Sequence, residues 1–152
     1  MKRILWVMIA CIIWFSRGSE THAYNPEDLN RLRLAKSCPG GDLTGANLQG
    51  MDLEDANLQN ANLLGANLYS AQLRRANLSG ANLRNANLQF ARLTQANLSQ
   101  TKLISADLGN AKLSEANLSG ANLQYANLKS ADLDQAVLTG AILSGSNLQS
   151  AG

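Results

Sequence analysis

The chain has 152 residues, which is enough for one domain. Aromatic residues make up only 5% of it, so a core must be built mainly from aliphatic side chains. The 13 basic and 11 acidic residues nearly balance, at a formal net charge of +2, which excludes the strongly basic surface that drives nucleic-acid binding.

The N-terminal segment has the layout of a secretory signal peptide. A basic pair precedes an unbroken apolar run over residues 4–15, and a small-residue cleavage site ends at Ala23. We therefore expect residues 1–23 to be removed on export, which leaves no stable membrane anchor. An uncleaved anchor is one alternative, although 12 apolar residues are few for a bilayer span. Lipidation at Cys11 is another, although the apolar run continues past this cysteine.

Cleavage changes the charge and the chemistry of the mature chain. Three of the 13 basic residues and one of the 11 acidic residues leave, so 10 of each remain. His22, the single histidine, leaves as well, which excludes a Ser-His-Asp triad, a Cys-His pair and a histidine metal site. No glycine-rich phosphate loop is present. We expect a protein that is not an enzyme and that needs no cofactor or metal.

A capping segment is expected over residues 24–40. Asn25-Pro26 followed by two acids has the marks of a helix start, and leucines follow at helical spacing, so we expect a short helix over residues 26–36. Laid over the first coil of the next domain, it would bury leucines that no earlier coil covers. Cys38 becomes the lone cysteine, which excludes an intramolecular disulfide; we expect it packed at the cap, with a reactive or intermolecular thiol as the alternative.

From residue 41 onward the chain is a five-residue repeat. Leucine recurs at every fifth position from Leu43 to Leu148, 22 times without a miss, and the residue two before it is alanine 18 times. The residue just before the leucine is Asn 12 times and Asp four times. A period of five suits neither a helical stripe nor one face of a strand. It suits one side of a coil, with Ala and Leu inward, Asn outward and a turn in the last two residues.

These A-[ND]-L-x-x repeats resemble the pentapeptide-repeat family, over residues 41–151. The resemblance implies an all-β solenoid over residues 41–152, a right-handed quadrilateral β-helix with four repeats per coil. The repeats would make about 5.5 coils, in a rod about 26 Å long at the spacing of neighbouring strands. Outward side chains one coil apart should then stack on the same face.

The family resemblance also bears on compartment and role. Exported lumenal members from cyanobacteria and chloroplasts look similar, often with a Cys-Pro-x-Cys-like segment opening the first coil. This chain has Cys38-Pro39-Gly40-Gly41, without the second cysteine. We expect localisation in the periplasm or thylakoid lumen, and a non-enzymatic rod that presents its surfaces to an unidentified protein partner. The alternative is a DNA mimic that binds DNA gyrase, although such mimics are strongly negative and cytosolic.

One outward face carries an acid-base-acid pattern. Acids at residues 52–55 come first and acids at residues 132–134 come last, and between them lie the basic residues Arg74, Arg75, Arg92 and Lys112. We expect Glu54 over Arg74 and Asp55 over Arg75 to form ion pairs. Calcium binding by the first acids is a lesser alternative. The face is either a solvated charged surface or a docking surface that orients a partner.

A second face carries outward apolar residues. Leu64 and Ile104 lie on it with Arg84 between them, and Tyr125, Phe90 and Tyr69 lie on it or on its neighbour. Scattered apolar residues are normal on a surface, and a modest protein-contact patch is the alternative.

The C-terminal end lacks a cap, because the repeat still runs at Ala151-Gly152. Its last repeats are looser, with Val137, Ile142 and Ser146 at positions that usually hold Asn or Ala. An uncovered coil exposes an open backbone edge, so a homodimer through this coil is one hypothesis.

Overall fold

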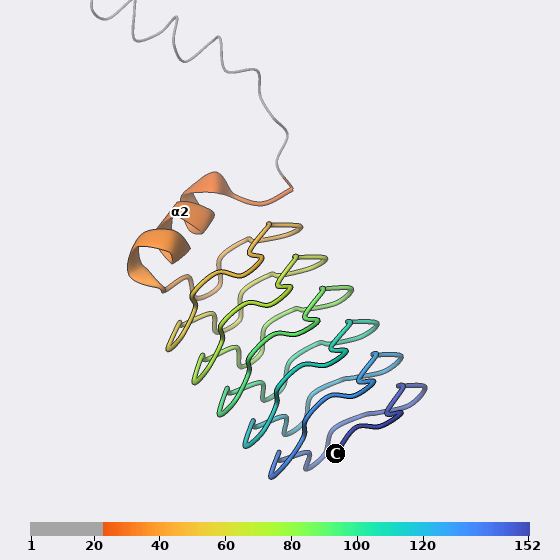
Figure 1. The fold of residues 1–152 in the computed structure, drawn as a ribbon. Helices are drawn as coiled ribbons and strands as arrows, with labels where there is room; N and C mark the ends of the chain where they lie inside the picture. The colour runs from red at the N-terminus through yellow and green to blue at the C-terminus, as the bar shows by residue number, and fades with distance from the viewer. Residues whose placement is uncertain (1–22) are drawn as a thin grey trace, which may run out of the picture.

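The computed structural model describes residues 23–152. The expected signal peptide, with Cys11 and His22, lies outside the described residues except for Ala23. One helix, α2 (Pro26–Ala35), precedes a long stack of coils (Figure 1). Within the described residues, no helix has the length and apolar character needed to cross a bilayer.

Helix α2 begins and ends as its sequence indicates. The Asn25 side chain accepts a hydrogen bond from the Glu27 amide at 2.9 Å, and proline occupies the first turn, where its missing N–H is not needed. The helix ends at Ala35, one residue before the expected end. Lys36 takes the left-handed conformation with φ 48°, and its amide donates to the Leu32 carbonyl at 2.9 Å.

Helix α2 is tied to the first coil by packing and by hydrogen bonds. Leu29 and Leu32 are buried in the same core as the repeat leucines. The Asp28 carboxylate accepts from the Asp42 amide at 2.8 Å, and the Asn25 amide donates to the Asp42 carbonyl at 2.9 Å. The helix therefore packs against the core and hydrogen-bonds to the backbone of the first coil.

Successive coils are joined by parallel bridges between residues 20 apart, from Ser37↔Asn57 to Asn127↔Asn147. Four repeats thus complete one coil (Figure 1). Each bridge joins residues that precede leucines, except that Ser37 precedes Cys38. The Leu63 amide, for example, donates to the Asn82 carbonyl at 2.8 Å in the next coil.

These bridges are isolated, and the described residues form no longer strand. The expected all-β character is therefore present as ladders of single bridges. The reason lies in the repeat, where only about three residues are extended before a turn begins. The Ala46 amide closes such a turn on the Leu43 carbonyl at 3.0 Å, and the same bond recurs along the stack.

Every turn places its last residue in the left-handed region. In all 22 repeats the residue two after the leucine has positive φ; seven of these residues are glycine and 15 are not. Glycine adopts this conformation without strain. The structure shows that Phe90, Arg75 and Tyr125 adopt the same conformation without being glycine, which costs on the order of 1 kcal/mol each.

The core is a stack of leucine and alanine, and its exceptions are accommodated locally. Thr101 and Ser146 replace alanine, and each hydroxyl donates at 2.7 Å to the carbonyl of the preceding leucine. Met51 is partly buried against the core. Gly41 replaces alanine beside Cys38, whose Sγ occupies the place of a β-carbon. The two hydroxyl groups in the alanine column are therefore hydrogen-bonded.

The outward Asn column makes two kinds of hydrogen bond. The Asn82 amide donates to the Asn62 side-chain oxygen of the previous coil at 2.9 Å. The Asn87 side-chain oxygen accepts from the Gln89 backbone amide at 3.0 Å. The column therefore stabilises both the stack and its corners.

Burial declines in the last described coil. Leu128 is buried, whereas Leu138 and Leu143 are only partly buried and Leu148 is 42% exposed. Val137 and Ile142, which stand at the usual Asn position, are exposed as well. These side chains leave an apolar end on the described part of the rod.

Candidate protein-interaction site

The structure separates the two groups of candidate residues. Leu64, Arg84 and Ile104 follow leucines of one column, and the charged candidates flank leucines of the column half a coil away. Because four repeats make one coil, the two groups lie on opposite sides of the rod. We call the first the apolar side and the second the charged face. They do not form one surface.

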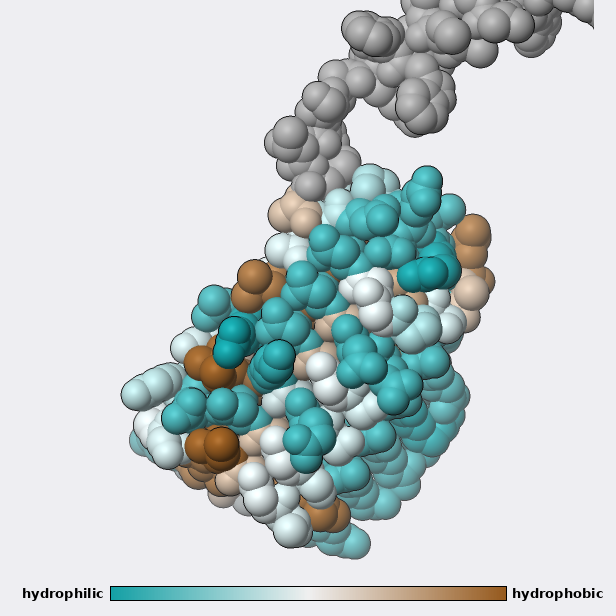
Figure 2. Space-filling model, turned by 180° about the vertical axis from the view of Figure 1, so that it is seen from behind, coloured by the Kyte–Doolittle hydropathy of each residue, from teal (hydrophilic) through white to brown (hydrophobic). Residues whose placement is uncertain are grey.

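The apolar side is discontinuous. Leu64 is 37% exposed, Ile104 is less exposed, and the exposed Arg84 separates them. Tyr125 is 68% exposed and lies close over Gly145, where a β-carbon would come within 2.6 Å of its ring. In Figure 2 the hydrophobic areas are isolated and surrounded by hydrophilic surface.

Tyr69 and Phe90 form an aromatic pair on the neighbouring face. Their ring centroids lie 5.4 Å apart at an interplanar angle of 61°, an edge-on arrangement. Phe90 keeps almost half of its surface exposed. The pair stabilises two adjacent coils and adds little continuous apolar surface.

The ion pairs on the charged face differ from the expected pattern in one respect. Arg75 binds both carboxylate oxygens of Asp55, at 2.8 and 2.7 Å, as expected. Glu54, expected to pair with Arg74, lies 3.9 Å from Arg74 but 3.0 Å from Arg75. Arg75 therefore serves both acids, because its guanidinium offers several donors in a fork. Arg74 is left with one weak contact.

A further ion pair was not expected from the sequence. The Lys36 ammonium contacts the Asp52 carboxylate at 2.7 Å. The left-handed backbone of Lys36 ends α2 above this face, so its side chain can reach the coil that carries Asp52. The sequence predicts that the helix ends near Lys36, but it does not predict the direction in which the Lys36 side chain points.

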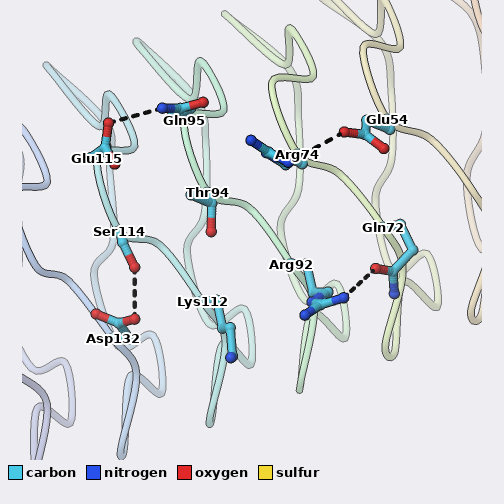
Figure 3. Close-up of a pocket in the computed structure, with 10 residues that line it drawn as sticks. All are labelled: Glu54, Gln72, Arg74, Arg92, Thr94, Gln95, Lys112, Ser114, Glu115 and Asp132. Carbon is cyan, nitrogen blue, oxygen red and sulfur yellow. Dashed lines mark hydrogen bonds and ion pairs between the residues drawn. The ribbon is translucent and has the colours of Figure 1, made fainter.

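Along the charged face runs a groove of about 460 Å³ (Figure 3). Ten side chains line it, drawn from five successive coils. They are Glu54, Gln72, Arg74, Arg92, Thr94, Gln95, Lys112, Ser114, Glu115 and Asp132. Arg74, Arg92 and Lys112 are thus brought together, and Arg75 is not among the lining residues.

The acids of the groove are held by neighbours other than its central cations. Ser114 donates to the Asp132 carboxylate at 2.6 Å, and Gln95 donates to Glu115 at 2.9 Å (Figure 3). The Ser114 hydroxyl is the main reason that the pKa of Asp132 lies below its ordinary value, with a smaller contribution from the charge of Lys112. The carboxyl is therefore ionised at neutral pH.

Two cations are left without a carboxylate. Arg92 donates only to the neutral side chain of Gln72, at 3.4 Å. Within residues 23–152, the Lys112 ammonium makes no hydrogen bond or ion pair. Because Arg92 and Lys112 are bridge partners, two like charges face each other on adjacent coils. The groove therefore has a cationic centre and acidic ends.

Other chemistry is sparse in the described residues. Residues 23–152 contain no group of three His, Cys, Asp or Glu side chains placed to hold a metal ion. Cys38 is fully buried, as expected for a packed residue, and its Sγ accepts from the Arg31 guanidinium at 3.4 Å. This contact fixes the cysteine between α2 and the first coil.

The repeat is matched by a family model for pentapeptide repeats. Eight copies cover residues 42–80, 81–120 and 116–151, which is well over half of the chain. The chain belongs to the pentapeptide-repeat family. This confirms the resemblance read from the A-[ND]-L-x-x pattern. Proteins of this family are typically structural or interaction proteins.

Solved pentapeptide-repeat structures share the fold. HetL, involved in heterocyst differentiation regulation in the cyanobacterium Nostoc sp. strain PCC 7120, is 40% identical, with a TM-score of 0.51 over 76% of this chain and 60% of HetL. A protein of the Arabidopsis thaliana thylakoid lumen is 30% identical, with a TM-score of 0.59 over 61% of this chain and 66% of that protein.

A third pentapeptide-repeat structure shows likeness of fold alone. QnrB1, a plasmid-mediated fluoroquinolone resistance protein, is 24% identical, with a TM-score of 0.62 over 76% of this chain and 62% of QnrB1. The chain thus spans about three fifths to two thirds of the length of these relatives. Comparison with curated protein sequences finds no match.

Proposed function

We propose that this protein is an exported, non-enzymatic interaction protein, a rigid rod that presents outward side chains to a protein partner. The observation that carries the proposal is the groove on the charged face, where Arg92 and Lys112 have no carboxylate partner. Nearly every inward position is taken by buried Leu or Ala, so binding must use outward side chains. Typical family members act in this way.

The finer description of the rod belongs to the same proposal. We infer a right-handed quadrilateral β-helix of about 5.5 coils over residues 41–152, with residues 24–40 as its cap. The bridges between residues 20 apart support the coil length. The burial of Leu29 and Leu32 of α2 supports the capping role.

Export rests on the sequence of residues 1–23 and on one relative. The Arabidopsis relative comes from the thylakoid lumen, which is one of the two compartments expected here. The test is the N-terminal residue and cell fraction of the native protein, by terminal sequencing after fractionation. A chain that starts at Tyr24 in a periplasmic or lumenal fraction supports export. A cytosolic chain that retains Met1 contradicts it.

The alternative, a DNA mimic that binds gyrase, receives less support. Residues 23–152 hold 10 basic residues (13 minus three) and 10 acidic residues (11 minus one), so the rod has no net negative charge. The likeness to QnrB1, at 24% identity, concerns the fold. An assay of gyrase supercoiling with the purified protein separates the two functions, because inhibition or protection at stoichiometric concentration would favour the mimic.

Self-association through the last described coil is a further proposal about partners. The partly exposed Leu138 and Leu143 and the exposed Leu148 offer apolar surface, and the amides of these leucines have no backbone acceptor among the described residues. An edge with free donors and apolar side chains favours pairing with another edge. Sedimentation equilibrium at high micromolar concentration tests this, and a monomer there would remove it.

A further inference from the structure

In the described residues no carboxylate lies within ion-pair distance of Arg92 or Lys112, although the charge of Lys112 acts on Asp132, its bridge partner on the next coil. Arg92 and Lys112 belong to adjacent coils whose backbones lie about 4.8 Å apart. Arg74, one coil earlier, has only the 3.9 Å contact with Glu54. Like charges at this spacing repel each other unless an anion lies between them.

The nearby acids do not supply that anion. Ser114 donates to Asp132, Gln95 donates to Glu115, and the nearest cation to Glu54 is Arg75. All three acids lie at the rim of the groove (Figure 3). A carboxylate within hydrogen-bond distance of both Arg92 and Lys112 would therefore come from outside the described chain.

We propose that the groove binds a short acidic segment of a partner protein in an extended conformation, with Arg92, Lys112 and Arg74 contacting its carboxylates. The three cations lie on three successive coils and span about 10 Å along the rod. Side chains two residues apart on an extended peptide lie about 6.6 Å apart on one side, so two alternate carboxylates fit this span. This assignment rests on the proposed interaction function and names the partner's chemistry.

The acidic ends of the groove decide against a nucleic acid. One strand in B-form geometry carries a negative charge every ~3.4 Å, so such a strand laid along the whole groove would also face Glu54 at one end and Asp132 at the other. A segment with two or three carboxylates can contact Arg74, Arg92 and Lys112 without extending to Glu54 or Asp132, and Glu115, on the coil of Lys112, accepts a hydrogen bond from Gln95. Thr94, which faces the groove between the ends, adds a hydroxyl able to donate to the bound chain.

The same charge pattern decides against a second copy of this face. A two-fold interface places the middle of a surface against its own symmetry mate. Here that arrangement would bring Arg92 and Lys112 of one chain against the same residues of the other. The resulting repulsion makes a foreign acidic segment the better partner.

The test is binding of a synthetic peptide in which glutamate alternates with glycine, measured by isothermal titration calorimetry on the full chain. We expect the double variant Arg92→Gln/Lys112→Gln to weaken binding at least tenfold. The control is Lys102→Gln/Lys129→Gln, which removes the same charge from exposed residues away from the charged face. We expect less than a twofold change for the control, and unfolding temperatures close to that of the unsubstituted chain for both variants.

Three results would overturn this assignment: no binding by the unsubstituted chain, equal weakening by both double variants, or tighter binding of an oligonucleotide of the same charge. Capture of the partner protein from the native cell fraction distinguishes failure of the groove assignment from failure of the proposed interaction function. If the groove variant captures the same partner as the unsubstituted chain, the groove is wrong and the interaction function stands. If the peptide binds as expected but no partner is captured, the groove stands and the function is contradicted.

Discussion

Gly41 and Cys38 share one position in the first coil: a β-carbon added to Gly41 would fall on the Sγ of Cys38. Gly41 stands where 18 other repeats have alanine, and its backbone is outside the left-handed region. Its missing side chain therefore serves packing and not backbone conformation. The fully buried Cys38 occupies the place of the usual alanine methyl group.

Replacing Gly41 by alanine should destabilise the protein most while the Cys38 sulfur is present. Overpacking of this kind costs about 1–3 kcal/mol of unfolding free energy. In the Cys38→Ala background the same substitution should cost clearly less, because the β-carbon then meets only the Asp28 side chain and the carbonyl oxygen of residue 38, each at 3.3 Å. Urea unfolding of the two single variants and the double variant measures this coupling. Equal costs in both backgrounds would show that the sulfur is not the obstacle.

Acid should destabilise the fold through its paired aspartates. Arg75 lowers the pKa of Asp55, mainly by its hydrogen bonds, and Lys36 lowers that of Asp52 in the same way. Because these pKa values are lower in the folded than in the unfolded chain, the stabilisation is complete above the ordinary value of 3.8 and is lost as pH falls through the lower folded values. We expect an unfolding temperature that is flat from pH 7 to 5 and falls below about pH 4.

The variants Asp55→Asn and Arg75→Gln identify the source of this acid sensitivity. Each removes the bidentate pair, so each should reduce the fall in unfolding temperature at low pH, and combining them should add little. Thermal unfolding across pH in low salt provides the measurement. An unchanged acid profile in both variants would assign the sensitivity to other carboxyls.

Glycine at a left-handed corner should stabilise the rod. Ser105 is exposed and has φ 56°, so Ser105→Gly should add on the order of 0.5–1 kcal/mol by removing backbone strain. Ser79 stands one position earlier in its repeat and is outside the left-handed region, so Ser79→Gly should cost a similar amount through chain entropy. Denaturant unfolding of the pair compares the two positions. The same sign of change at both would contradict this account of the turns.

The apolar side provides a test that is independent of the groove. Replacing Leu64 and Ile104 by serine should leave the unfolding temperature almost unchanged, because both side chains point outward from the core. If this side contacts the partner, the double variant should lose partner capture from the native fraction. Capture equal to that of the unsubstituted chain would leave the charged face as the remaining candidate.

The five-residue period of the sequence predicts most of the architecture. Leucine at every fifth position, with alanine two before it, predicts inward stacking because only a coil with a corner in each repeat keeps both on one side. The same period predicts which outward residues stack, so Asp55 over Arg75 could be paired from numbering alone. The helix start at Asn25 could also be predicted from the sequence, because helix capping depends on residues that are neighbours in the chain.

Tertiary structure decided what long side chains do once the coils are stacked. Arg75 instead of Arg74 lies closest to Glu54, and Lys36 reaches Asp52 from the end of α2. Arg92 and Lys112 have no carboxylate within ion-pair distance, because the nearby acids accept hydrogen bonds from Ser114 and Gln95. Repeat spacing places the Cα atoms, whereas rotamers and competition among donors within a few ångströms decide the pairs.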